Sequence, residues 1–533
     1  MRPSESTGLT WRSLSHMRII LTGLCGLVSR NSFRLLWLLC VLYFLCSIVQ
    51  ASRATLDFDE VVTLRVSQMG SVRGIWDSLL AGCDTQPPLQ YVLTRVSLGL
   101  FGEGLVPLRL PTILGFWCMA LCLYAWLAKR FSAVLALAGA LFPLLTAAYP
   151  QALIARPYGL MLGFCALTLL SWQRAAQVGH RTLALTGLAL SLAAGVYSHF
   201  YAILVFVPIV IGELVRALNR KSLDYPVCAA IIAGSLPVFL LIPLMKAGHQ
   251  YSEHFWAQPG LASVPSAYAN LLGGRAPLFL ILIAGLASVS VRWASNSASA
   301  SQSRVNFPPH ELAAVLSLAG MPFLVWIVAC LYTKAFTPSY PIVAVIGLAI
   351  LLVVLVDTNQ EHRILFGGAM ALCFLGFAAV QLRHSVNELF SGAPADKASS
   401  LHPSGWQGHF ELPASLDIGE LPVVISDPHT FGYLTHYAEA RFKRRLYYLT
   451  HHTAAVRYSG YDTDDRLLGA LKHWTDWNVE DYSAFVEKNG KFLVYSTEGW
   501  LVPKLLADHA HIELLGQYED EYLYRVIFTP AVN

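Results

Sequence analysis

The chain has 533 residues, of which 55% are hydrophobic and only 13% are charged. This composition, with a mean hydropathy of +0.52, excludes an ordinary soluble enzyme. The formal net charge is +4 and no stretch forms a basic stripe, so no nucleic-acid partner is expected. Runs of about 20 apolar residues, the length that crosses the hydrocarbon of a bilayer, recur between residues 33 and 381.

The N-terminal segment, residues 1–32, is basic. Five arginines and a single acid occupy the first 34 positions, which predicts a cytoplasmic N-terminus by the positive-inside rule. The hydrophobic run 33–50 is long enough to span a membrane, and no small-residue cleavage site follows it. We therefore expect a retained first helix and not a removed signal peptide.

The hydrophobic runs predict a polytopic α-helical membrane protein with about 11–13 transmembrane helices. Eleven spans are expected, with soft edges, at 33–50, 109–128, 131–149, 155–172, 183–199, 200–217, 227–245, 276–291, 311–331, 340–356 and 364–381. With a cytoplasmic start, this count leaves the basic turns between helices inside and puts the loop 51–108 outside. The apolar stretch 89–102 is too short to span and is expected to be re-entrant or interfacial.

From residue 391 the composition changes to that of a soluble domain. Short strands are expected at 421–426, 491–496 and 522–528, and helices in PHTFGYLTHYAEARF and GWLVPKLLADHA. The sequence predicts a transmembrane domain at 33–385 and a small extracytoplasmic α/β domain at 391–533, close to a common domain size.

The loop that follows the first span carries three carboxylates, Asp57, Asp59 and Glu60. A carboxylate in an aqueous loop beside a membrane can act as a general base, and a second one can bind a metal, hold an arginine or fix the loop. The alternative interpretation is that Asp59 and Glu60 cap the helix that begins at VVTLRVSQM, since acids are favoured at a helix N-terminus.

Further polar residues lie at the external ends of predicted helices. Asp84 and Gln86 precede the stiff Pro-Pro turn of CDTQPPLQY, which alternatively serves helix initiation alone. Arg109 in PLRLP and Arg156 in ARPY suit a phosphate, whose oxygens accept paired N–H bonds, or alternatively snorkel to the interface. His199 in YSHFYA is a site candidate or a member of an aromatic belt.

No metal centre is predicted. The ten cysteines form no CxxC pattern, and the histidines have neither zinc-finger nor HExxH spacing. A carboxylate pair can work with or without a cation, so no cofactor is assigned and a divalent cation stays open.

FDEVVTLR, QPPLQYVLTRVSLGLFG, RLPTILGFW, ARPYGLML and YSHFYAILVFVP follow one another in the order found in GT-C-fold glycosyltransferases. The chain most resembles the branch of protein O-mannosyltransferases, aminoarabinose lipid A transferases and bacterial galacturonosyltransferase-like proteins, over about residues 33–385. Two positions depart from the pattern. Gln86 stands where members often have histidine, and Ser339 precedes Tyr340 where many have arginine, with Lys334 as a substitute for that charge.

The resemblance implies a GT-C fold and an enzyme that moves a hexose or pentose from a polyprenyl-phosphate donor to an acceptor hydroxyl. It implies inversion at the anomeric carbon, with Asp59 as general base and Glu60 as its partner. Arg109, Arg156 and Lys334 would bind the donor phosphate. Further substrate-site candidates are Asp84, Gln86, Tyr158, His199 and Tyr340.

Two other functions remain open from the sequence: a transporter or flippase of lipid-linked sugars, and a non-catalytic GT-C-like binding protein. A transporter would have internal repeats and ionisable residues at mid-membrane depth, whereas here the ionisable residues gather at helix ends. The acceptor, whether lipid, glycan or protein, is not specified by the sequence. The expected location is the bacterial cytoplasmic (inner) membrane, among its lipids, with the C-terminal domain outside.

Overall fold

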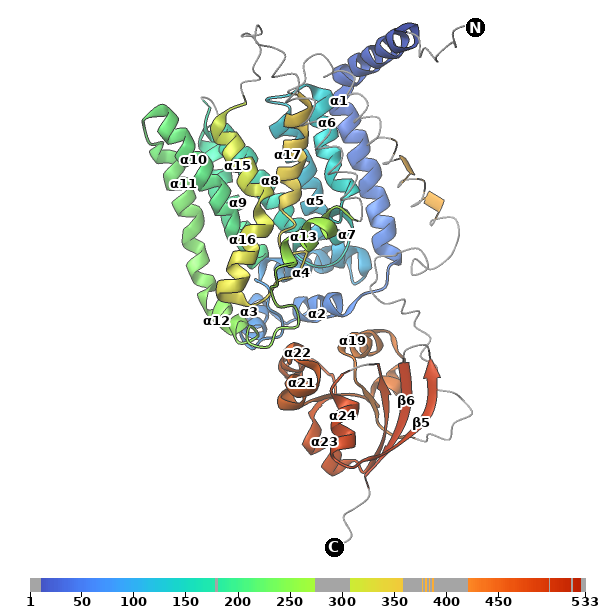
Figure 1. The fold of residues 1–533 in the computed structure, drawn as a ribbon. Coiled ribbons are helices and arrows are strands. Elements are labelled where there is room, and N and C mark those ends of the chain that lie inside the picture. The colour runs from blue at the N-terminus through green and yellow to red at the C-terminus, as the bar shows by residue number, and fades with distance from the viewer. Residues whose placement is uncertain are drawn as a thin grey trace, which may run out of the picture.

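The structure is a computed structural model that describes residues 11–177, 181–273, 307–357, 420–497, 499–518 and 521–528, with isolated positions between 376 and 387. It has two parts, a helical body and a small α/β domain, which meet at the short helices that follow α1 (Trp11–Arg53) (Figure 1). The N-terminal end of α1 and the α/β domain lie at opposite ends of the molecule (Figure 1).

The helical body is built mainly from apolar helices that run along its long axis (Figure 1). After α1 they are α5 (Leu105–Leu127), α6 (Ala133–Leu141), α7 (Ala148–Gln151), α8 (Tyr158–Ala175), α9 (Arg181–Ser198), α10 (Phe206–Arg220), α11 (Tyr225–Ser235), α12 (Ile242–His249), α13 (Ser263–Leu271), α15 (Pro309–Ala319), α16 (Met321–Val328) and α17 (Ala344–Asp357). Four short helices of other types extend them. Three are 3-10 helices, η1 (Phe142–Leu145), η2 (Phe200–Val205) and η3 (Leu236–Leu241), and one is the π-helix η4 (Ala329–Thr333).

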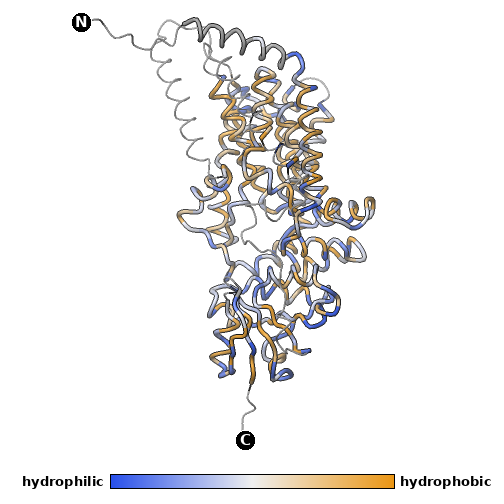
Figure 2. Tube along the Cα trace, turned by 90° about the vertical axis from the view of Figure 1, so that its right-hand side faces the viewer, coloured by the Kyte–Doolittle hydropathy of each residue, from blue (hydrophilic) through white to orange (hydrophobic). Residues whose placement is uncertain are grey.

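Four stretches of helix among the described residues are long and apolar enough to cross a membrane: Arg30–Arg53, Leu105–Leu127, Phe200–Arg220 and Tyr225–His249. A fifth is added if the bent pair Pro309–Ala319 and Met321–Thr333 is one span. Hydrophobic residues follow the helical body along its length, whereas the α/β domain is mixed (Figure 2). The predicted span 276–291 and most of 364–381 lie outside the described residues, so the total of 11–13 stays a prediction.

Three short helices close the end of the body that faces the α/β domain: α2 (Phe58–Ser67), α3 (Val72–Leu80) and α4 (Leu89–Phe101). At 13 residues, α4 is too short to span, in agreement with the expectation for 89–102. Apolar residues of α2, α3 and α4 share one hydrophobic cluster with residues of the α/β domain. The loop predicted to carry the chemistry is therefore sandwiched between the two parts of the molecule.

The C-terminal part is an α/β domain with a six-stranded mixed sheet in the order β3-β2-β1-β4-β6-β5. Strands β1 to β4 pair in parallel, and β6 pairs antiparallel with β4 and β5. The strands are β1 (Val423–Ile425), β2 (Leu446–Thr450), β3 (Val479–Asp481), β4 (Lys491–Ser496), β5 (His511–Tyr518) and β6 (Glu521–Ile527). The helices are α19 (Pro428–Tyr437), α20 (Ala440–Lys443), α21 (His452–Ser459), α22 (Thr463–Leu471), α23 (Tyr482–Lys488) and α24 (Leu501–Ala507).

This confirms the predicted helical body with a small sheet domain, and it confirms the strands expected around 421–426, 491–496 and 522–528. Strands β2, β3 and β5 were not predicted. β1 is buried along its whole length, whereas β2 follows the basic run RFKRR and β3 has only one buried residue. The places of β2 and β3 in the sheet come from pairing with β1 and with each other, which local pattern does not reveal.

The α/β domain is docked on α2 through α19. A Cβ on Gly432 would lie 2.5 Å from the Phe58 ring, and that ring meets the His429 ring at a centroid distance of 5.5 Å. The Leu56 N–H donates to the Tyr437 hydroxyl at 2.9 Å. Such close backbone-to-ring packing orients the domain over the start of α2.

Helices α5 and α8 approach so closely that glycines form their interface. A Cβ on Gly159 would lie 2.1 Å from the Thr112 carbonyl oxygen, and one on Gly115 would lie 2.5 Å from the Gly159 carbonyl oxygen. Because these neighbours are backbone atoms, they cannot move aside as a flexible side chain would.

Replacement of Gly159 by alanine should therefore lower stability by about 1–3 kcal/mol through overpacking. Thermal unfolding of the detergent-solubilised protein measures this effect. Gly99→Ala on α4 is the matched control, because a Cβ there meets nothing within 4 Å. Equal unfolding midpoints for the two variants would contradict the packing described here.

Candidate active site

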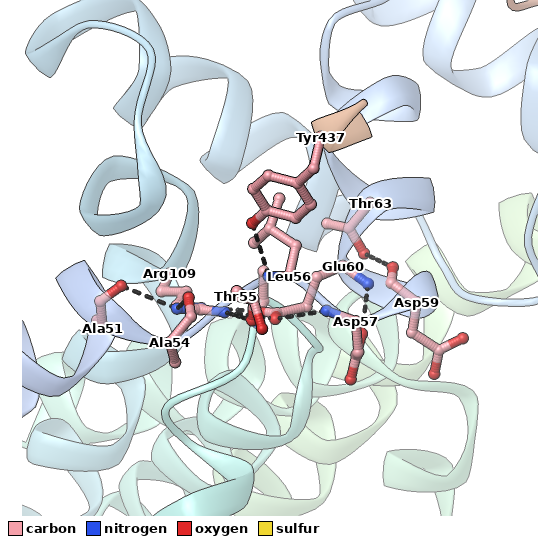
Figure 3. A network of polar contacts seen from close by, with 11 residues as sticks. Ala51, Ala54, Thr55, Leu56, Asp57, Asp59, Glu60, Thr63, Arg109 and Tyr437 are labelled. Carbon is pink, nitrogen blue, oxygen red and sulfur yellow. Dashed lines mark hydrogen bonds and ion pairs between the residues drawn. The ribbon is translucent and has the colours of Figure 1, made fainter. Parts of the chain in front are cut away.

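The first turn of α2 sends neighbouring side chains in different directions. Asp57 is the N-cap: its Oδ1 accepts the Glu60 N–H at 2.8 Å, and the Glu60 carboxylate accepts the Asp57 N–H at 3.4 Å. Phe58 packs on the α/β domain, and Glu60 points into the helical body. Asp59 lies between them in the chain, and its side chain points away from Glu60 and Arg109 (Figure 3). The capping alternative thus applies to Asp57 and Glu60 and leaves Asp59 available.

Glu60 forms a buried ion pair with Arg109 of α5. The Arg109 Nε and Nη2 donate to the two carboxylate oxygens at 2.7 and 2.6 Å, and both residues are 1% exposed. Nη1 donates to the Ala51 and Ala54 carbonyls at 2.8 and 2.9 Å, and Nη2 to the Thr55 carbonyl at 3.0 Å (Figure 3). All five guanidinium N–H groups are therefore engaged.

These contacts join four segments at one point. Arg109 binds carbonyls at the C-terminal end of α1, where a cation is favoured, and Glu60 also accepts the Ala155 N–H at 2.6 Å. The end of α1, the start of α2, α5 and the turn before α8 are thus held together. Because no N–H of Arg109 remains for a phosphate, we assign Arg109 to holding the loop and not to the donor-binding role expected from the sequence.

Arg156 lies between two carboxylates. Its Nη1 donates to Asp84 Oδ2 at 2.6 Å, and its Nε lies 3.5 Å from Asp59 Oδ2. The Asp59 side chain is 54% exposed, against 4% for Asp84 and 10% for Arg156. Within the described residues, the Arg156 Nη2 group has no hydrogen-bond partner in the protein. The site therefore has a solvent-accessible carboxylate beside an arginine that keeps unused donors.

A cavity of about 280 Å³ is lined in part by Thr85 and Gln86, the two residues that follow Asp84 in the chain. Gln86, His199, Tyr201 and Tyr340 are among the residues that line it. The Tyr201 and Tyr340 rings stack at 4.7 Å, and His199 meets Tyr340 at 5.6 Å. The His199 ring also lies 5.5 Å from that of Tyr158, two residues after Arg156.

The structure thus brings together the candidates Asp59, Asp84, Gln86, Arg156, Tyr158, His199 and Tyr340. Lys334 is exposed between the cavity-lining Thr333 and Ala335, and its Nζ donates to the Cys330 carbonyl. Tyr201 was not singled out from the sequence, although it lies in the same YSHFYA segment as His199. Over the described part of the chain, no group of three or more His, Cys, Asp or Glu side chains is arranged to hold a metal ion.

Asp464, an acid of α22 in the α/β domain, is affected by the charge of Asp59. Burial and then the charges of Asp465, Asp427 and Asp59, opposed by His429, raise the pKa of Asp464 to about 6. The charge of Asp59 acts on Asp464 across the boundary between the two parts. No sequence pattern connects α22 with α2, so this proximity was not predicted.

Asp57 has a raised pKa as well. Burial, followed by the negative charges of Glu60 and Asp59, raises the pKa of this carboxyl to about 7, although the Glu60 N–H and Arg156 oppose the shift. An unfolded aspartate titrates near a pKa of about 3.9. Because the folded protein binds the proton more tightly, Asp57 contributes stability below about pH 4 that is lost as pH rises through about 7.

Arg109→Lys should destabilise the protein by about 3–5 kcal/mol, because a lysine cannot replace the five-donor fork and leaves Glu60 poorly paired in a buried site. Thermal unfolding in detergent measures the loss. Arg73→Lys is the control, since the Arg73 side chain is 90% exposed and its one ion pair spans 3.7 Å. An Arg109→Lys midpoint equal to that of the control would refute the role given to Arg109.

Asp57→Asn keeps an N-cap acceptor and removes the titrating carboxyl. The unfolding midpoint of the wild type, relative to that of this variant, should fall as pH rises from about 5 to about 8, the range that brackets the raised pKa. Asp77→Asn, a change on an exposed side chain, should show no such trend. A pH-independent difference between the wild type and Asp57→Asn would mean that Asp57 does not titrate in this range.

Comparison with known proteins identifies the fold of this chain. The sequence profile of dolichyl-phosphate-mannose-protein mannosyltransferases matches residues 85–242. A comparison with curated protein sequences finds no match. Among solved structures, ArnT from Cupriavidus metallidurans bound to undecaprenyl phosphate aligns with a TM-score of 0.55 at 14% identity, over 93% of this chain and 98% of that chain.

The apo state of the same ArnT aligns with a TM-score of 0.57 at 14% identity and the same coverage. The oligosaccharyltransferase of Archaeoglobus fulgidus is a weaker match, with a TM-score of 0.45 at 11% identity over 86% of this chain and 67% of that chain. The chain therefore has the GT-C fold of membrane glycosyltransferases, and residues 85–242 carry the sequence pattern of the dolichyl-phosphate-mannose-protein mannosyltransferase family.

Proposed function

We propose that this protein transfers a sugar from a polyprenyl-phosphate-linked donor to an acceptor hydroxyl. The observation that supports this proposal most is an exposed carboxylate, Asp59, beside Arg156, an arginine that keeps unused donors and whose charge acts on the cavity-lining His199. The GT-C fold and the family profile support the same reaction class. The ArnT of similar fold is bound to undecaprenyl phosphate in its crystal structure, which supports a lipid phosphate as the leaving group here.

In this reaction Arg156 binds the donor phosphate. Asp84 holds Nη1 at 2.6 Å and so orients the guanidinium, while Nη2 stays available for phosphate oxygens. A fixed cation stabilises the negative charge that develops as the phosphate leaves. Lys334, which flanks the cavity and uses one ammonium N–H on Cys330, supplies a second phosphate contact with its remaining donors.

Asp59 takes the proton of the acceptor hydroxyl as that oxygen attacks the anomeric carbon. The bond between the anomeric carbon and the phosphate oxygen breaks in the same step, and polyprenyl phosphate leaves. A single displacement of this kind inverts the anomeric configuration. Glu60 acts as a positioning residue through Arg109 and does not touch the substrate.

We propose the bacterial inner membrane as the location, with the N-terminus cytoplasmic and the α/β domain extracytoplasmic. The basic N-terminal segment supports this orientation, as does the arrangement of α1 and the α/β domain at opposite ends of the body (Figure 1). The candidate site, at the start of α2 on which α19 packs, then lies on the extracytoplasmic side. A lipid, a glycan or a protein could present the acceptor hydroxyl there.

Asp59→Asn should reduce transfer by at least about 100-fold, the usual loss on removal of a general base, and leave the unfolding midpoint unchanged because the side chain is 54% exposed. The assay follows the release of undecaprenyl phosphate from undecaprenyl-phosphate sugars in membranes that contain candidate acceptors. Asp77→Asn, at 46% exposure, is the matched control. Full turnover by Asp59→Asn would reject Asp59 as the base.

A further inference from the structure

The backbone of Lys334, the residue given a second phosphate contact above, has an unfavourable conformation. Lys334 follows η4, the π-helical turn that ends at Thr333, and its φ of 53° lies in the left-handed region. Residues with a Cβ seldom adopt this conformation, and at the end of a helix it usually belongs to glycine. Such a residue persists only where its surroundings hold it, and both strained residues and π-helical turns are frequent at functional sites.

The Tyr201 hydroxyl binds the residues on both sides of Lys334. It lies 2.6 Å from the Thr333 hydroxyl and donates to the Ala335 carbonyl at 2.8 Å. The Thr333 hydroxyl also accepts the Ala335 N–H at 3.5 Å. These three residues therefore form a closed ring of hydrogen bonds around the strained lysine.

The Tyr201 ring contacts the other end of the same loop. It stacks on the Tyr340 ring at a centroid distance of 4.7 Å and an interplanar angle of 27°. Between these two points, the buried Phe336 donates its N–H to the Ala257 carbonyl at 2.8 Å. Tyr201 itself lies on η2, at the start of the apolar helical stretch Phe200–Arg220. The loop that carries Lys334 is thus fixed to a helix of the body.

The position of the Lys334 charge depends on this backbone. The residue lies between Thr333 and Ala335, both of which line the cavity. Its ammonium group donates to the Cys330 carbonyl and keeps further N–H groups for an anion. A lysine side chain is long and flexible, so fixing the backbone from which it starts reduces the number of positions that its charge can take.

We propose that Tyr201 is a positioning residue for the donor phosphate: it holds the backbone of Lys334 so that the ammonium group reaches the phosphate, and does not itself bind the phosphate. The inference rests on the proposed function, in which Lys334 contacts that group. A loop without the Tyr201 hydrogen bonds would have to be ordered when the lipid binds, which lowers affinity. The Tyr201 hydroxyl therefore affects binding of a lipid phosphate only while the Lys334 charge is present.

The test is a double-mutant cycle on the binding of undecaprenyl phosphate to the purified full-length protein in nanodiscs. Tyr201→Phe removes both hydroxyl contacts and keeps the stacked ring, and Lys334→Gln removes the charge. Lys334→Gln should weaken binding about tenfold or more, the effect of a charged hydrogen bond, and Tyr201→Phe roughly three- to tenfold, the effect of a neutral one. Tyr201→Phe should cause no further loss in the Lys334→Gln background.

Two variants and one lipid are the controls. Tyr268→Phe removes a hydroxyl that donates to the Ala319 carbonyl at 2.8 Å elsewhere in the helical body. Lys221→Gln changes a lysine at the end of α10 that also has a φ of 53°. Both should bind undecaprenyl phosphate as the wild type does, whatever their unfolding midpoints. Undecaprenol, which lacks the phosphate, should bind equally well to the wild type and to Tyr201→Phe.

Three outcomes would overturn the proposal and leave the proposed function intact: unchanged binding in Tyr201→Phe, the same further loss in the Lys334→Gln background, or an equal loss for undecaprenol. Unchanged binding in Lys334→Gln would remove Lys334 from the phosphate site and the proposal with it, while Arg156 would remain the proposed phosphate ligand. Failure of the wild type to bind undecaprenyl phosphate at all would reject the proposed function itself.

Discussion

The buried ion pair between Glu60 and Arg109 determines where the rest of the site lies. A buried charge is tolerated only when it is paired and its hydrogen bonds are satisfied, and here all five donors of Arg109 are used. The carbonyls that accept the remaining Arg109 hydrogen bonds belong to Ala51 near the end of α1 and to Ala54 and Thr55 just after it, and Glu60 accepts a hydrogen bond from the turn before α8. The pair is thus a rigid anchor for the loop, and the direction of Asp59 is a consequence of that anchor.

Adjacent carboxylates and two arginines have separate tasks because their surroundings differ. Asp57 caps a helix, Glu60 is buried against Arg109, and Asp59 between them is 54% exposed beside Arg156. Arg109 has no donor to spare, whereas Arg156 does. The residues that make the site rigid are therefore distinct from those proposed to meet the substrate. This separation agrees with the general need for a preorganised site on rigid elements.

The helical body, the sheet domain and most members of the candidate site could be predicted from the sequence, because polar residues at the ends of apolar runs stand out. Asp59 and Arg156 were also identified as members of one region. Arg109 could not be distinguished from Arg156, since each occupies an arginine-containing turn and only tertiary contacts reveal which is saturated. The docking of α19 on α2 and the position of Asp464 depend on contacts between residues several hundred positions apart, which no local pattern encodes.

The most direct measurement is a cryo-EM map of the protein with bound undecaprenyl phosphate. The account predicts phosphate density within hydrogen-bond distance of Arg156 Nη2, close to Asp59, with the Glu60–Arg109 pair unchanged. Phosphate density at Arg109 with Glu60 displaced, or lipid bound at the opposite end of the helical body near Arg181 and Arg220, would contradict it. Either result would show that the exposed carboxylate of Asp59 is not next to the reacting bond.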